Sequence, residues 1–377
     1  MNRQKSSARF RFTAASMLLA CLIFLVPALR DGNPTLFLLA ALLPCVMFLC
    51  DTVVARMFSL DRMITALILW LCAAGIAAYA PSDPDAALTQ ALRSGSALIA
   101  LTAGGIMIRS LSPSLLTSAC TAFLGLLLLA GKLLSPAMSL PLTEAALALL
   151  LIAFAALLSR QGPVSALVLS AAALVLLLVR GEMAEAVLWG LAVLLLVYAS
   201  DGRAVVVLPA LAVVLLLFFG AFTLLPVQGF SQDPSSFSVL ASAGAVGADP
   251  LPEGFAWPDS VSIFPLLAGS YGLLLSGMTA LLFLPLTLRG TSVAASARTR
   301  FHAVLAMGVS LQLALRALAA LISVFGFLPL SGLRLPFLTS SLPDLCAQGF
   351  IAGLLCGISG RNDADLAEDA HLAMLAK

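Results

Sequence analysis

The side chains that could do chemistry in this chain are a few charged residues at the edges of apolar runs or inside them. Asp259 precedes one such run and Glu144 opens another, and a carboxylate so placed can act as a general base toward a hydroxyl group. Arg334 lies between two runs, where its guanidinium could hold a phosphate through paired hydrogen bonds. A base and a cation are what group transfer from a phosphate-bearing donor requires.

The composition predicts the environment in which these residues act. Hydrophobic residues make up 61% of the 377 residues, charged residues only 10%, and the mean hydropathy is +1.09, whereas soluble domains are roughly 45–50% apolar. A helix needs about 20 apolar residues to cross the roughly 30 Å of hydrocarbon in a bilayer, and the chain has many such runs. The sequence therefore predicts an all-α, polytopic membrane helical protein.

Each candidate also has a structural explanation. Asp259 could cap the helix that follows it, Glu144 could complement the dipole of the helix it opens, and the Arg334 head could reach along its stem to the membrane surface. Arg316 is harder to explain in this way, because an Arg at the centre of a span costs at least about 2.5–3.5 kcal/mol and is usually paired or functional. Glu144 and Asp344 are its candidate partners, and Asp344, itself near the start of a span, also needs one.

About 12 spans are predicted, and they alternate across the membrane. They lie at about 12–29, 35–50, 62–80, 93–109, 113–132, 142–159, 164–180, 184–200, 204–225, 262–287, 301–326 and 337–358. With the N-terminus in the cytoplasm, most of the 20 Lys and Arg residues fall on the cytoplasmic side, as the positive-inside rule requires. A signal peptide is the competing interpretation of residues 1–29, but no small-x-small cleavage site follows them.

The polar connections divide the chain into three parts. Residues 1–61 would form an N-terminal tail with two helices, 62–360 a membrane domain, and 361–377 a cytoplasmic tail. The long segment 226–261 is predicted to be an outer loop, because it is rich in Ser, Gly, Pro and Asp. Long loops on a rigid scaffold are where function usually resides.

The seven cysteines and two histidines do not indicate a metal site. All the cysteines lie in apolar runs, none in a Cys-x-x-Cys or Cys/His cluster, so packing roles are favoured. His302 is predicted to be a cytoplasmic surface residue, as is His371. No cofactor is expected, and the sequence does not indicate a divalent cation.

Several motifs, in order along the chain, resemble one family. Residues 326–337 read Gly-x-Leu-Pro-x-x-Gly-x-x-Leu-Pro-Phe, the span at 142–159 begins Pro-Leu-Thr-Glu, and Leu-Pro-Glu at 251–253 precedes the span at 262–287. The pattern resembles the SEDS proteins (shape, elongation, division and sporulation: FtsW, RodA, SpoVE). The resemblance covers about 62–360 and implies a ten-helix core, to which the first two helices are an addition.

The resemblance also implies an activity. SEDS proteins are glycosyltransferases that polymerise undecaprenyl-linked lipid II into peptidoglycan in the bacterial cytoplasmic membrane, each with a class B penicillin-binding protein as its partner. Their general base is an Asp four residues after the Glu of Leu-Pro-Glu. Counting forward from Glu253 reaches Trp257, and counting back from the next helix reaches Val261, with Asp259 midway. Two residues of extended chain move a side chain only about 6–7 Å, so Asp259 is the predicted base. Residues expected around the substrate are Glu144, Glu253, Arg316, Arg334 and Asp344, the arginines toward its pyrophosphate.

Departures from the family pattern keep two other functions open. Where the family has a Lys three residues after its Glu, this chain has Leu147, and Gly162 stands where the family has an Asp. Gly269 and Ser270 stand where the family has paired acids. A non-catalytic scaffold of envelope assembly, or a transporter or ligase of another lipid-linked saccharide, therefore remains an alternative.

Overall fold

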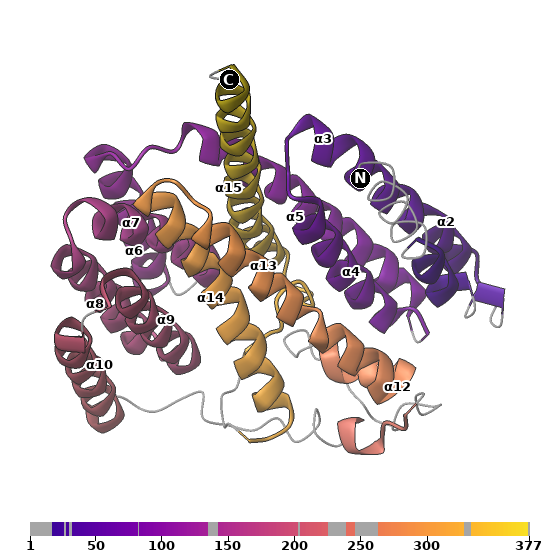
Figure 1. Cartoon of the computed structure of the whole chain (residues 1–377). Helices are drawn as coiled ribbons and strands as arrows, with labels where there is room; N and C mark the ends of the chain where they lie inside the picture. The colour runs from indigo at the N-terminus through magenta and orange to yellow at the C-terminus, as the bar shows by residue number, and fades with distance from the viewer. Residues whose placement is uncertain are drawn as a thin grey trace.

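The protein is a bundle of helices (Figure 1). The computed structural model describes residues 17–25, 28–29, 32–81, 83–134, 142–202, 204–224, 239–245, 263–327 and 333–375. All regular elements within these ranges are helical, which confirms the predicted fold class. The predicted site residues Glu253 and Asp259, and most of the 226–261 loop, lie outside the described residues.

The named helices follow the predicted apolar runs closely. They are α2 (Pro34–Leu49), the π-helix η1 (Cys50–Val54), α3 (Ala55–Met57), α4 (Arg62–Tyr79), α5 (Pro84–Ser110), α6 (Leu115–Leu134), α7 (Thr143–Arg160), α8 (Pro163–Val179), α9 (Met183–Asp201), α10 (Ala204–Leu224), α12 (Ile263–Leu281), α13 (Phe283–Ala295), α14 (Arg300–Val324) and α15 (Leu342–Leu375). Within the described ranges, eight helical segments are long and apolar enough to cross a membrane, and three shorter apolar helices accompany them. The chain is a multi-pass membrane protein.

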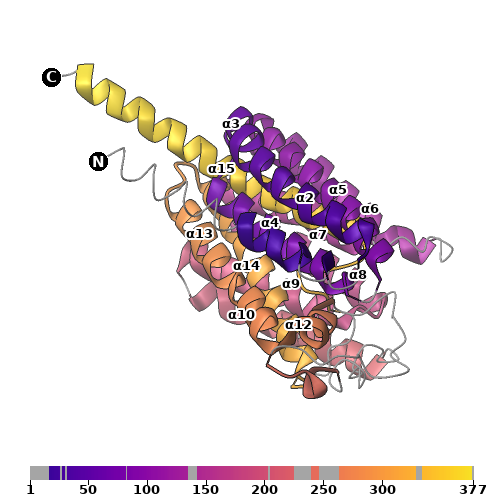
Figure 2. The same cartoon turned by 90° about the vertical axis from the view of Figure 1, so that its right-hand side faces the viewer.

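α15 occupies the centre of the bundle. It packs along α5 and also contacts α7, α14 and α4, and Figure 1 shows it between α4 and α5 on one side and α6 to α10 on the other. Gly349, Gly353 and Gly357, four residues apart, face α5 so closely that a Cβ would collide with backbone atoms of Ala97, Leu101 and Gly105. Small residues of this spacing let membrane helices approach each other. The last part of α15 extends beyond the other helices (Figure 2).

Local sequence sets where several helices begin. Asp61 caps α4 by accepting hydrogen bonds from the amides of Met63 and Ile64, and Asp83 caps α5 in the same way. Thr299 caps α14 and accepts from the amide of His302. The prediction that His302 lies at the surface is wrong, because its side chain is buried and its ring packs edge-on against Phe301.

The predicted span 262–287 is a broken helix. Gly272 has φ 87° and ψ 169° inside α12, a conformation that is essentially restricted to glycine. The break frees backbone amides, and those of Leu273 and Leu274 donate to the carbonyls of Gly244 and Ala245 at 3.1 and 3.3 Å. The described part of the long loop, 239–245, is therefore attached to the break in α12.

Candidate functional site

One guanidinium bridges two carboxylates inside the bundle. Arg316 of α14 donates through Nη1 to Oε1 of Glu144, in the first turn of α7, and through Nη2 to Oε2 of Glu185, in the first turn of α9. Arg316 is 4% exposed and Glu144 6%. Of the two acids considered as structural partners of Arg316, Glu144 is the one that pairs with it, and Glu185 is a second partner that the sequence interpretation did not include.

Gln348 joins this cluster to the segment that precedes α15. Its side-chain amide donates to Oε1 of Glu144 at 3.3 Å, and its Oε1 accepts from the backbone amide of Phe337 at 2.7 Å. Phe337 is fully buried and has φ 63°, a left-handed conformation that costs a bulky residue roughly 1–2 kcal/mol. The strained end of the Leu-Pro-Phe motif is therefore held by the same side chain that contacts Glu144.

Arg334 and Asp344 form a separate pair. Arg334 Nη1 donates to Oδ2 of Asp344 at 2.6 Å, and the two side chains are 22% and 9% exposed. Asp344 opens α15, so this pair ties the residues before the helix to its first turn. Asp344 has the partner that its position requires, although that partner is Arg334 and not Arg316.

A third charged pair flanks Glu144. Arg180 Nη2 donates to Oε1 of Glu182 at 2.7 Å and to the hydroxyl of Thr143 at 3.0 Å, and Thr143 donates to Glu182 Oε2 at 2.9 Å. Thr143 precedes Glu144 in the chain. The residues just before α9 are therefore fixed to the first turn of α7.

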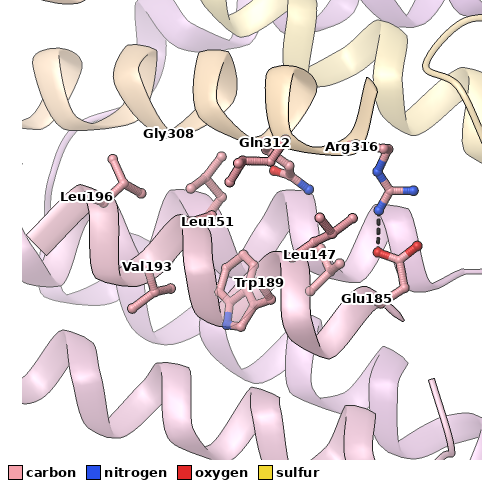
Figure 3. A pocket seen from close by; sticks show the side chains of 12 residues that line it. Leu147, Leu151, Glu185, Trp189, Val193, Leu196, Gly308, Gln312 and Arg316 are labelled. Atoms are coloured by element: carbon pink, nitrogen blue, oxygen red, sulfur yellow. Dashed lines mark hydrogen bonds and ion pairs between the residues drawn. The ribbon is translucent and has the colours of Figure 1, made fainter. Parts of the chain in front are cut away.

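A narrow cavity extends from the cluster along α9 and α14 (Figure 3). Arg316 and Glu185 lie at one end, and the remaining wall is mostly apolar and includes Leu147, Trp189 and Gln312. Its volume is ≈ 10 Å³, close to the minimum for one water molecule. In this conformation the cavity admits no sugar or pyrophosphate, so a substrate would have to meet the cluster from outside it.

These groups share one end of the bundle. Glu144, Glu185 and Asp344 lie in the first turns of α7, α9 and α15, and Gln348 lies one turn further along α15. The structure thus places Glu144 and Arg316 in one group and Arg334 and Asp344 in a second group. Residues of α15 take part in both, through Gln348 and Asp344. Among the described residues no group of three or more His, Cys, Asp and Glu is arranged to hold a metal ion.

Comparison with known proteins assigns the architecture. Residues 257–362 match the FtsW/RodA/SpoVE family of cell cycle proteins, and the whole fold resembles solved SEDS structures. One of these is a peptidoglycan synthase complex, described as coordinating polymerization and crosslinking. The match covers 81% of this chain and 98% of the chain in that complex, with a TM-score of 0.62 and 21% identity. The fold is thus that of these structures, and the family match covers the last third of the described helices, from the start of α12 into α15.

Two further relatives support the assignment. The rod shape determining protein RodA of Thermus thermophilus aligns with 80% of this chain and 96% of its own, with a TM-score of 0.57 and 19% identity. A probable peptidoglycan glycosyltransferase FtsW of Geobacter sulfurreducens is 36% identical over 109 residues, and one of Geobacter metallireducens is 34% identical over 99. The aligned segments span only 29% and 26% of those two relatives and 28% and 26% of this chain.

Glu185 and Gln348 belong to the Glu144 cluster, and sequence reasoning missed both. The signal for Glu185 was its position, since it occupies the first turn of an apolar run at the same predicted membrane side as Glu144. Gln348 is a polar residue in an apolar run, and such residues in membrane helices commonly hydrogen-bond across helices. Neither signal identifies the partner without the packing.

Proposed function

We propose that this protein is a SEDS-type glycosyltransferase that polymerises lipid II into peptidoglycan in the bacterial cytoplasmic membrane. The observation that carries the proposal is the buried cluster of Glu144, Glu185, Arg316 and Gln348 within a SEDS fold. Two carboxylates share one guanidinium there, an arrangement that packing alone does not require. In this proposal both chain termini are cytoplasmic and the cluster faces the opposite side.

The proposed roles follow the chemistry of the reaction. Asp259 takes the proton from the acceptor hydroxyl as general base, and Glu253, six residues earlier in the chain, contacts the substrate. Arg334 lies at the edge of the bundle and contacts the donor pyrophosphate. Glu144 and Arg316 form the inner wall of the site, and Glu144 orients the base or the acceptor sugar.

The attachment of residues 239–245 to α12 supports this arrangement. Their carbonyls accept from the amides of Leu273 and Leu274, so the chain is tied to the membrane helices at Ala245, 14 residues before Asp259. A class B penicillin-binding protein is the proposed partner, because a structural neighbour is a complex that combines polymerization and crosslinking.

A purified-protein assay tests the proposal. The full chain is reconstituted with fluorescent lipid II, with and without the partner transpeptidase, and glycan polymers are resolved by gel electrophoresis. We expect polymer from the wild type and a loss of about 100-fold or more in Asp259→Asn, the usual contribution of a general base. Asp85→Asn is the matched control, because Asp85 is an exposed carboxylate at the start of α5. Equal activity in Asp259→Asn and wild type would mean that Asp259 is not the base.

The internal pairing of the cluster favours one alternative, a non-catalytic scaffold. Every charged group of the cluster already has a charged partner within the protein, and an ion pair of this kind can serve packing alone. No polymer from the wild type, even with the partner present, would support the scaffold. Turnover of another lipid-linked saccharide instead of lipid II would indicate a transporter or ligase.

A further inference from the structure

An open groove lies where α9 and α13 end and α14 begins. Its volume is ≈ 280 Å³, near the lower end of the roughly 300–1,000 Å³ of small-molecule pockets. Four of its nine lining residues are alanines, Ala294 and Ala295 from α13, Ala303 from α14 and Ala199 from α9. The groove is distant from the Glu144 cluster, because Arg300 at its mouth and Arg316 are separated by about 24 Å along α14.

The groove begins at the membrane boundary and extends into the apolar layer. Its lining includes Ser200, Ala295 and Arg300, which are terminal residues of three of the membrane-spanning segments. It reaches Met307, seven residues further along α14 and therefore about 10 Å deeper. A ligand that fills it has a polar end at the surface and an apolar part in the hydrocarbon.

Basic side chains lie at the mouth of the groove. Arg300 lines the groove, the exposed Arg298 precedes it by two residues, and none of the described residues that line the groove is acidic. The amino end of α14, a helix of 25 residues, lies at the same place, and helix N-termini attract phosphate groups. Basic pockets between membrane helices of this kind suit lipid head groups.

We propose that this groove binds one anionic phospholipid, with an acyl chain along Ala303 and Met307 and the head-group phosphate at Arg298, Arg300 and the start of α14. The apolar floor distinguishes such a ligand from free phosphate, which would occupy only the mouth. The site is independent of the proposed catalytic activity.

Native mass spectrometry of the purified full-length protein tests this site. The protein is equilibrated in micelles that contain equal amounts of phosphatidylglycerol and phosphatidylcholine with the same acyl chains. We expect the wild type to retain phosphatidylglycerol preferentially, and the double variant Arg298→Gln/Arg300→Gln to lose that preference by about tenfold or more, since each basic residue near an anionic lipid contributes roughly 1 kcal/mol. Arg160→Gln is the control, because Arg160 is exposed at the end of α7 and outside the groove.

A second variant tests the acyl chain independently of charge. Ala303→Leu fills the groove from its floor, and we expect it to reduce retention of phosphatidylglycerol while gel filtration remains like that of the wild type. Equal retention of the two lipids by the wild type would overturn the proposal. Displacement of the lipid by millimolar inorganic phosphate, or unchanged retention in both groove variants, would also overturn it.

Discussion

At one end of the bundle Asp61 meets Arg289 and Ser359, and at the other Arg316 lies between Glu144 and Glu185. Asp61 accepts from the amides of Met63 and Ile64 through Oδ1, and from Arg289 at 2.7 and 2.9 Å and Ser359 at 2.6 Å through Oδ2. The charge of one carboxylate is balanced by one guanidinium, and both oxygens of Asp61 accept hydrogen bonds. The bonds join the start of α4 to α13 and α15.

The Glu144 end has a different charge balance. Arg316 faces two carboxylates, and the only other side chain bonded to Glu144 in the described part of the chain is the neutral Gln348. A buried excess of negative charge is costly, so stability alone does not explain it. The comparison favours a structural role for the Asp61 end and supports the functional role proposed for the Glu144 end, and α15 connects the two.

The largest expected effect comes from Arg316→Leu. It leaves Glu144 and Glu185 buried without a cation, and loss of one partner of a buried ion pair costs about 3–5 kcal/mol. We expect a large fall in the thermal unfolding midpoint of the purified protein and no polymerisation of lipid II. Arg316→Lys is the control, because it keeps the charge but cannot bridge both acids in the same way. An unchanged midpoint in Arg316→Leu would contradict the charge pairing.

A matched pair of variants tests the comparison directly. Glu144→Gln keeps the side-chain shape, and Arg316 retains Glu185, so we expect a loss of activity of about 100-fold or more with little change in the unfolding midpoint. Asp61→Asn should do the opposite, since it weakens several hydrogen bonds at once, each worth about 1.5–3 kcal/mol when charged, while the folded fraction remains active. The readouts are polymerisation rate per folded protein and the unfolding midpoint. If both variants lowered the unfolding midpoint and left the polymerisation rate per folded protein unchanged, the Glu144 end would be structural too.

Composition, the length of the apolar runs and motif order were enough to predict the all-helical fold, the SEDS resemblance and the need of Arg316 for an acid. They could not reveal that α9 faces α14, because helix packing depends on which faces meet and apolar runs of Ala and Leu are nearly alike on all sides. Glu185 and the Asp61 pair were missed for that reason. The break at Gly272 was also missed, because an isolated glycine in an apolar run is compatible with an intact helix.

α15 can be perturbed between the two ends without touching either. A side chain at Gly353 would collide with the backbone of Leu101, so we expect Gly353→Ala to cost about 1–3 kcal/mol through overpacking and to lower activity less than Glu144→Gln does. Gly277→Ala is the control, because nothing lies within 4 Å of the added methyl group. The measurements are the unfolding midpoint and the polymerisation rate. Equal behaviour of the two variants would show that close α5–α15 packing is not required.

The smallest effect on stability is expected at the edge of the Glu144 end, in Arg334→Gln. The side chains of Arg334 and Asp344 are 22% and 9% exposed, and Gln can still donate a hydrogen bond to Asp344, so the unfolding midpoint should fall less than in Arg316→Leu. If Arg334 contacts the donor pyrophosphate, KM for lipid II should nevertheless rise. Asp344→Asn separates the two roles, because it removes the ion pair but keeps the guanidinium that would contact the donor. A rise in KM in Arg334→Gln but not in Asp344→Asn would show that Arg334 binds the substrate. Equal effects in both variants would show that Arg334 only holds the start of α15.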